Sequence, residues 1–224
     1  MCGRYSFVPS KKQLKEQLSE VEIPEDLQLS YNIAPTNQAY VVSNDAPHQL
    51  QLMEWGLVPF WSKDGVNSGK MINARAEGIA EKPSFREPYR KRRCLIPADS
   101  FYEWRTAPGK KKIPYRILSA DGGLLFLAGI WDEWKQGPLR KKTFSILTTV
   151  PNREVSVLHD RMPVLLTTPE ARNIWLTDPE GSAGLLHPAE DGYLKLYRVS
   201  EKINAPGSGG SELQDPVAED LQLF

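Results

Sequence analysis

Cysteine and histidine are scarce in this sequence: its 224 residues include only Cys2, Cys94 and three histidines. Two thiols so far apart do not indicate the disulfide framework of a small secreted domain, and they fit a reducing compartment. So few thiols and imidazoles also leave no ligand spacing typical of a zinc site. We therefore expect two free thiols, no bound metal and a cytoplasmic location.

Long apolar runs and phosphate-binding glycine patterns are missing as well. No run approaches the roughly 18 apolar residues that a membrane-spanning helix needs, and none resembles a secretory signal. No Walker or dinucleotide glycine motif appears, so no cofactor is expected. The composition, 40% hydrophobic and 25% charged, is ordinary for a globular protein. We expect a monomeric single-domain protein that does not contact a membrane.

Net charge is zero, but the charges are unevenly distributed. With 28 basic and 28 acidic residues overall, and four acidic and no basic residues in 205–224, the rest of the chain has a net charge of +4. Basic residues cluster at 86–93, 110–112 and 140–142. Such clusters are more often solvated surface than binding sites, so they permit nucleic-acid binding without showing it.

Most predicted elements are short strands rich in branched and aromatic residues. They cover residues 40–43, 49–55, 94–97, 100–104, 114–118, 124–131, 143–149, 162–166 and 193–199. The first residues read as a loop. Strands that do not alternate regularly with helices predict an α+β fold around a curved, mainly antiparallel, barrel-like sheet.

Three helices are expected between these strands. One spans residues 11–19, where Ser10 and Gln13 have capping-box spacing. A second covers residues 84–91. The third starts at Thr168-Pro169-Glu170, an N-cap followed by proline and an acidic residue, and extends to about residue 176. Residues 205–211 (APGSGGS) read as a flexible connection, so we expect the domain to cover residues 1–204.

The N-terminus carries unusual chemistry. Methionine before a small residue is normally removed, which would leave Cys2 with a free α-amine beside its thiol. An α-amine has a pKa of about 7.7 to 8.0, so roughly a tenth of it is neutral and nucleophilic at pH 7. The amine can attack an aldehyde, and the thiol can close the imine to a five-membered thiazolidine. By position alone, Cys2 is more often an incidental small residue than a nucleophile.

Seven short motifs occur in order along nearly the whole chain. They are Met1-Cys2-Gly3-Arg4, Tyr31-Asn32-Ile33-Ala34-Pro35, Trp55-Gly56-Leu57-Val58-Pro59, Ile72-Asn73-Ala74-Arg75-Ala76-Glu77, Arg93-Cys94-Leu95-Ile96-Pro97, Phe101-Tyr102-Glu103-Trp104 and His159-Asp160-Arg161-Met162-Pro163. Together they resemble the SOS response-associated peptidase family, whose members process abasic sites. The resemblance implies a single-domain fold that binds single-stranded DNA and crosslinks an abasic site through Cys2, protecting it from strand cleavage.

The resemblance also implies four catalytic residues: Cys2, Asn73, Glu103 and His159. Glu103 lies among aromatic residues, where desolvation raises the pKa of a carboxylate, and by resemblance it transfers protons during imine formation. His159 is implied as the second acid/base, acting on the deoxyribose oxygen. Asn73 can orient the amine or the sugar. A solvent-facing glutamate, a structural histidine and a buried asparagine remain the alternatives.

DNA contacts need cations for phosphates and flat side chains for bases. Arg4, Arg75 and Arg161 lie within the motifs, which makes them better phosphate candidates than the lysines at 110–112. Phe60 and Trp61 follow a motif on an expected loop, where they could stack bases or pack in the core. The remaining candidate DNA contacts are Pro35, Arg86 and Met162.

Two other functions compete with abasic-site capture. A peptidase would use Cys2 as its nucleophile, His159 as base, and Glu103 or Asn73 as the orienting group. A non-catalytic protein would only hold single-stranded DNA. The last residues are also open to two interpretations: 211–224 have the composition of an acidic tail, whereas Glu212-Leu213 and Pro216-Val217 are similar to the family's final segment, which returns to the domain.

Overall fold

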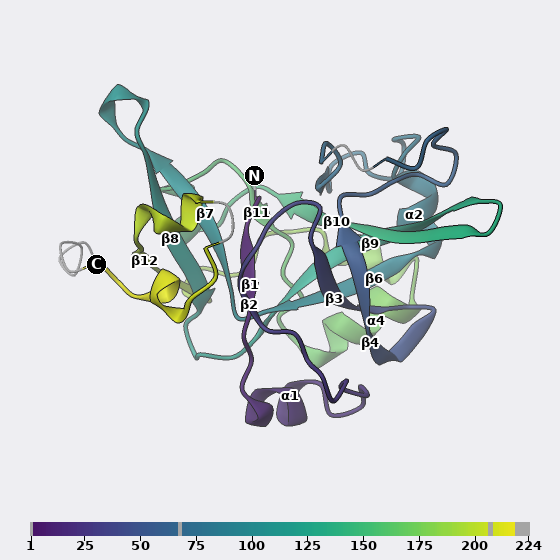
Figure 1. Ribbon diagram of the computed structural model, residues 1–224, viewed down its shortest axis with the longest axis horizontal. Helices are drawn as coiled ribbons and strands as arrows, with labels where there is room; N and C mark the ends of the chain where they lie inside the picture. The colour runs from purple at the N-terminus through teal and green to yellow at the C-terminus, as the bar shows by residue number, and fades with distance from the viewer. Residues whose placement is uncertain (1, 67–68, 206–207, 218–224) are drawn as a thin grey trace.

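Two β-sheets lie side by side in the computed structural model, which describes residues 2–66, 69–205 and 208–217 (Figure 1). Short helices flank the sheets, so the expected α+β class with a barrel-like sheet and a single domain is confirmed. Within the described residues, no helix is long and apolar enough to cross a membrane.

A closed five-stranded barrel forms the larger half. Its strands are β3 (Gln38–Ser43), β4 (Ala46–Trp55), β6 (Arg93–Ala98), β9 (Leu125–Gln136) and β10 (Leu139–Thr149). The barrel closes because β10 pairs with β9 on one side and with β4 on the other, the latter in parallel. Two further strands pair with β10. They are β5 (Asn73–Arg75), which is parallel to β10, and β11 (Met162–Pro163), which is antiparallel to it.

The smaller half is an antiparallel sheet in the order β12, β8, β7, β1 and β2. These strands are β12 (Leu194–Arg198), β8 (Lys112–Ser119), β7 (Ser100–Thr106), β1 (Tyr5–Phe7) and β2 (Ser30–Ile33). The expectation that the chain begins with a loop is wrong, because Tyr5–Phe7 pairs with both β2 and β7. Three residues are too few to show a strand periodicity, and only their tertiary neighbours make them a strand. This pairing carries the N-terminus into the centre of the molecule (Figure 1).

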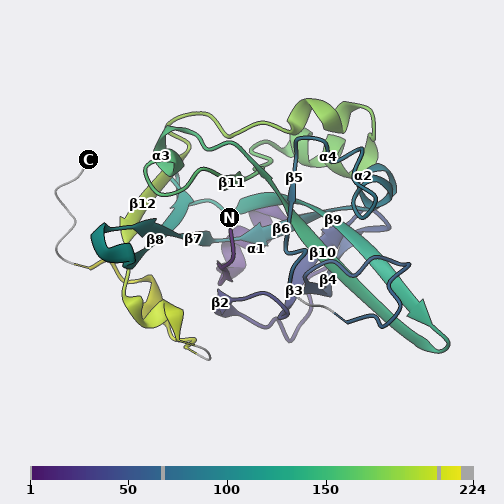
Figure 2. The same ribbon diagram turned by 90° about the horizontal axis from the view of Figure 1, so that it is seen from above.

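The helices begin where their capping residues predicted. Ser10 and Gln13 form the capping box of α1 (Lys11–Gln17), and Thr168 caps α4 (Pro169–Thr177). Viewed from above, α4 and α2 (Arg86–Lys91) lie over one side of the barrel (Figure 2). A short helix that was not predicted, α3 (Arg153–Ser156), is capped by Asn152 and precedes β11. Single-turn helices complete the elements: η1 (Pro108–Lys110), η2 (Gly181–Leu185), η3 (Glu201–Asn204) and η4 (Ser211–Gln214).

The C-terminal segment 208–217 packs on the smaller sheet. Leu213 is fully buried in a small apolar cluster with Tyr102, Val199 and Ile203. The Val217 N–H donates to the Arg198 carbonyl, which continues the pairing beyond β12. The expected connection at 205–211 includes residues 206–207, and the acidic tail includes 218–224; these lie outside the described residues.

Candidate active site

Cys2 is completely buried and lies just before β1 of the smaller sheet. Its backbone carbonyl accepts a 2.8 Å hydrogen bond from Nδ2 of Asn73, the first residue of β5. The bond links two residues 71 positions apart, so it depends on the parallel pairing of β5 with β10. Asn73 therefore orients the backbone of the residue that would carry the reacting amine.

Glu103 lies on β7, adjacent in the sheet to the N-terminal strand. The backbone N–H of Tyr102 donates to the Arg4 carbonyl, which aligns the two strands at this point. Glu103 is only 2% exposed, and burial raises the pKa of its carboxyl to about 7. A carboxyl with this pKa can both give and accept a proton near neutral pH.

The Cys2 thiol is a poor thiolate in this environment. Burial is the main cause that raises its pKa far above the usual value, and the charge of Glu103 raises it further. The thiol contacts the Arg4 carbonyl at 3.9 Å. A reactive cysteine normally lies in an environment that lowers its pKa, and this one does not.

His159 follows α3 in a tight turn. Its Nδ1 accepts a 3.0 Å hydrogen bond from the Arg161 backbone N–H, which assigns the proton of the neutral ring to Nε2. The Asp160 carboxylate lies 2.7 Å from the same Nδ1 and would stabilise the protonated ring instead. Burial lowers the pKa of His159 and outweighs the opposing effect of Asp160. The neutral ring accordingly prevails at neutral pH.

A pocket of about 460 Å³ brings Glu103 and His159 together. Trp104, Lys112 and Asn204 form the rest of its wall. The indole N–H of Trp104 donates to Oδ1 of Asn204 at 2.8 Å, which closes the pocket with η3. Sequence reasoning missed Lys112 and Asn204 as site residues. A general basic run was the only signal for Lys112, and nothing local marked Asn204.

Two predicted DNA contacts need correction. Arg161 is buried, and both its terminal nitrogens donate to the Glu77 carboxylate, at 2.8 and 2.7 Å. Its charge is therefore neutralised inside the protein, where it secures the His159 turn. Met162 is fully buried, and its sulfur accepts the Asn152 N–H. Arg161 lies just before β11 and Met162 is its first residue, and both side chains are buried and so are not presented to solvent in this structure.

The other predicted contacts lie nearer the surface. Arg4 is partly buried and donates to Oδ1 of Asn32 and to the Ile203 carbonyl, so it ties the N-terminal strand to η3. Arg75, at the end of β5, and Arg86, at the start of α2, are exposed. Pro35 is partly exposed in the turn between β2 and β3.

Phe60 and Trp61 lie on a loop that leaves the barrel after β4 and returns as β5. Each is 56% exposed, which excludes the alternative that they pack in the core. The Phe60 backbone N–H donates to the buried Asp132, and the Trp134 indole donates to the Ser62 carbonyl. The loop is therefore held on β9 while its two aromatic rings face solvent.

No group of three or more metal-ligating side chains occurs within residues 2–66, 69–205 and 208–217. Cys94 is fully buried, and burial raises the pKa of its thiol, so it is packed in the core away from any acid/base partner in the pocket. The side chains that line the pocket supply a neutral-range carboxyl, an imidazole, an ammonium, an indole and an amide, and Cys2 and Asn73 are not among its lining residues.

Comparison with known proteins places this arrangement in a family. The family model for SOS response associated peptidase (SRAP) matches residues 1–206. The chain belongs to the SRAP family. It is 41% identical to the abasic site processing protein YoqW of Bacillus subtilis over 223 residues, which are 95% of this chain and 98% of that protein.

More distant SRAP relatives include the abasic site processing protein HMCES of Rattus norvegicus, 31% identical over 97% of this chain and 76% of that protein. A crystal structure of a protein from Bacteroides thetaiotaomicron superposes with a TM-score of 0.81 at 29% identity, covering 96% of this chain and all of that one. The fold is therefore that of an SRAP domain.

Proposed function

We propose that this SRAP protein, after loss of Met1, captures abasic sites in single-stranded DNA as a thiazolidine on Cys2. The observation that carries the proposal is the convergence of four residues from separate parts of the chain. Asn73 holds the Cys2 carbonyl, the strand that carries Glu103 is hydrogen-bonded to the N-terminal strand at Arg4, and His159 shares a pocket with Glu103. Relatives named as abasic site processing proteins support the same substrate.

The reaction needs one aldehyde, one amine and one thiol, and it releases one water. Opening of the abasic sugar moves a proton from the C1′ hydroxyl to the ring oxygen, a transfer for which His159 is the candidate acid/base, and exposes the C1′ aldehyde. The Cys2 amine adds to that carbon, and Glu103 protonates the departing hydroxyl to give the imine. The thiol sulfur then bonds to the same carbon while its proton passes to the nitrogen.

An amine-first order suits the electrostatics of Cys2. A peptidase mechanism requires a thiolate as the initial nucleophile, but burial and the Glu103 charge hold the thiol in its protonated form. In the proposed reaction the thiol acts second, on an electrophilic imine, and it can be deprotonated as it attacks. The high thiol pKa therefore favours capture of an aldehyde over hydrolysis of an amide.

Three variants separate the two nucleophilic atoms. Mature Cys2→Ser and Cys2→Ala keep the amine, so they should form a Schiff base with an abasic oligonucleotide that borohydride traps but heat destroys. A variant with an uncleavable residue before Cys2 keeps only the thiol and should form no adduct. Adduct yield before and after heating, with and without borohydride, measures all three.

Mass spectrometry should show the wild-type protein without Met1. Stable crosslinking by the blocked-amine variant at the wild-type level would contradict the thiazolidine and support a thiol-only reaction. Cleavage of peptides without any DNA adduct would support the peptidase, and DNA binding without either reaction would support the non-catalytic protein. The intact mature chain is used in every arm.

A further inference from the structure

The β7–β8 hairpin contributes Glu103, Trp104 and Lys112 to the wall of the pocket. Thr106 at the end of β7 pairs with Lys112 at the start of β8. Trp104 is two residues before Thr106, so Trp104 and Lys112 lie on the same face of the hairpin. Both line the pocket, which sets Lys112 apart from the neighbouring lysines that the basic run contains.

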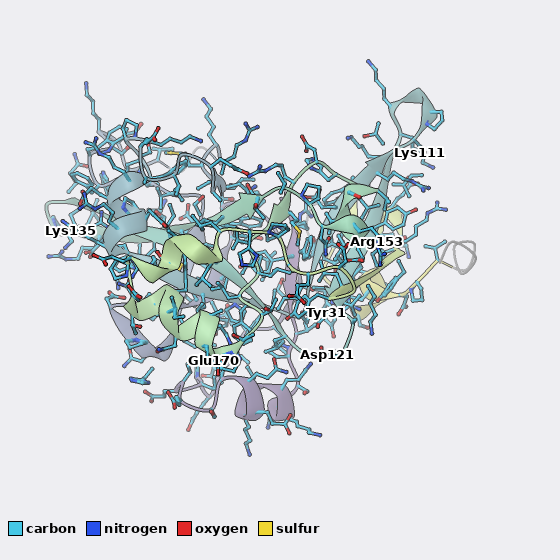
Figure 3. All side chains as sticks on the ribbon, turned by 180° about the vertical axis from the view of Figure 1, so that it is seen from behind. Tyr31, Lys111, Asp121, Lys135, Arg153 and Glu170 are labelled. Atoms are coloured by element: carbon cyan, nitrogen blue, oxygen red, sulfur yellow. The ribbon has the colours of Figure 1, made fainter. Side chains whose placement is uncertain are left out.

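The Lys112 ammonium is held in place without being neutralised. Its Nζ donates to Oγ1 of Thr106 at 2.7 Å, which uses one of three donors. Among the described residues, no carboxylate lies within ion-pair distance of this ammonium, whereas Lys111 is paired with Glu201 at 2.8 Å. Figure 3 shows Lys111 at the tip of the hairpin, which stands out from the body of the molecule.

The positive charge of Lys112 acts on His159, which lines the same pocket. It lowers the pKa of His159, in addition to the larger effect of burial. A cation that has no carboxylate partner within the described part of the chain, beside a neutral imidazole and a carboxyl that titrates near pH 7, suits an anionic ligand that enters with the substrate. A DNA strand brings such an anion on each side of every sugar.

We propose that Lys112 binds a phosphate directly flanking the abasic sugar, with Thr106 positioning its ammonium. This inference deepens the proposed function, because it assigns the substrate's backbone to one wall of the same pocket. Trp104 and Asn204 brace that wall through their hydrogen bond, so the phosphate would lie against the hairpin while the sugar faces Glu103 and His159.

Equilibrium binding to a single-stranded oligonucleotide with a tetrahydrofuran abasic analogue tests the inference without covalent chemistry. Lys112→Met should weaken binding about threefold to tenfold and reduce the slope of log affinity against log salt by about 0.7, the contribution of one phosphate contact. Lys112→Arg should restore most of the affinity. Lys110→Met is the matched control: Lys110 is exposed on the same hairpin but does not line the pocket, so binding should be nearly unchanged.

A second arm locates the phosphate. One methylphosphonate replaces the phosphate on either the 5′ or the 3′ side of the analogue, and the effect of Lys112→Met should disappear on the side that Lys112 contacts. Equal losses for Lys110→Met and Lys112→Met, persistence of the Lys112→Met effect with both neutral linkages, or no binding by the wild type would overturn the inference. Failure of the proposed function gives a different result. In that case the wild type would bind the analogue but form no heat-stable adduct with a true abasic site, which would contradict the crosslinking reaction and leave the Lys112 contact intact.

Discussion

At the scale of single residues, the burial of Glu103 gives its carboxyl a pKa near neutrality and also lowers the stability of the folded protein at neutral pH. In the unfolded chain its carboxyl loses its proton near pH 4.5, whereas in the folded protein burial raises the pKa to about 7. Between these values the unfolded state binds fewer protons than the folded state, so stability falls as the pH rises through this window. The penalty is absent below pH 4.5 and complete above pH 7.

Glu103→Gln should remove this pH dependence. The neutral isostere has no charge to desolvate, so the difference in unfolding free energy between variant and wild type should grow by about 3 kcal/mol from pH 4.5 to pH 8. Urea unfolding of both proteins at several pH values measures it, and groups common to both cancel in the difference. Adduct formation should slow by about 10² or more, because an amide cannot transfer the proton. A pH-independent difference in stability would contradict the raised pKa.

At the scale of elements, the loop between β4 and β5 presents aromatic rings on a fixed base. Gly65 lies directly under the Trp134 ring, where an added Cβ would approach ring atoms to 2.6 Å, and its φ of 65° also favours glycine. With the Phe60 and Ser62 backbone bonds, this contact makes the loop a rigid support for Phe60 and Trp61. Rigid aromatic rings lose little entropy when they stack on bases.

Phe60→Ala and Trp61→Ala should therefore separate binding from stability. Because both rings are exposed, the unfolding free energy should change by less than about 0.5 kcal/mol. Affinity for single-stranded DNA should fall by about 1 to 3 kcal/mol for each ring that stacks on a base. Thermal unfolding and fluorescence anisotropy measure the two effects. Leu139→Ala, an exposed apolar residue on the β9–β10 hairpin, serves as control; an equal loss of affinity there would refute the assignment.

At the scale of the whole molecule, the proposed active site exists only when the two sheets are together. Cys2 enters from β1 of the smaller sheet and Asn73 from β5 beside the barrel, while Glu103 and His159 reach the pocket from β7 and the turn after α3. No two of these residues are neighbours in sequence. Any acceleration beyond that of an isolated N-terminal cysteine must therefore vanish on unfolding.

The rate of adduct formation should fall in urea with the same midpoint as far-UV circular dichroism. A short peptide with an N-terminal cysteine and the first residues of the mature chain provides the baseline, since its amine and thiol react with aldehydes without any fold. Above the midpoint, protein and peptide should react at the same rate. A protein rate that stays above the peptide rate in fully unfolding urea would show that the converging residues are not the source of the acceleration.

The sequence by itself determined the fold class, the capped helices, most barrel strands and the family, because these depend on local periodicity, cap chemistry and ordered motifs. Some local patterns were insufficient. Strand β9 extends to Gln136 and β10 begins at Leu139, and the polar residues at these two strand ends carried no strand signal. The motifs also led to the prediction that Cys2, Asn73, Glu103 and His159 form the site.

Only the tertiary structure decided which charges are available and what each residue faces. Arg161 and Lys112 are both cations near His159, yet Glu77 neutralises the first, while the second faces the pocket. Met162 shares a motif with His159 but points into the core. The physical reason is that pairing and burial depend on residues far away in sequence, such as Glu77 for Arg161 and Asn204 for Trp104, and no local pattern encodes those distances.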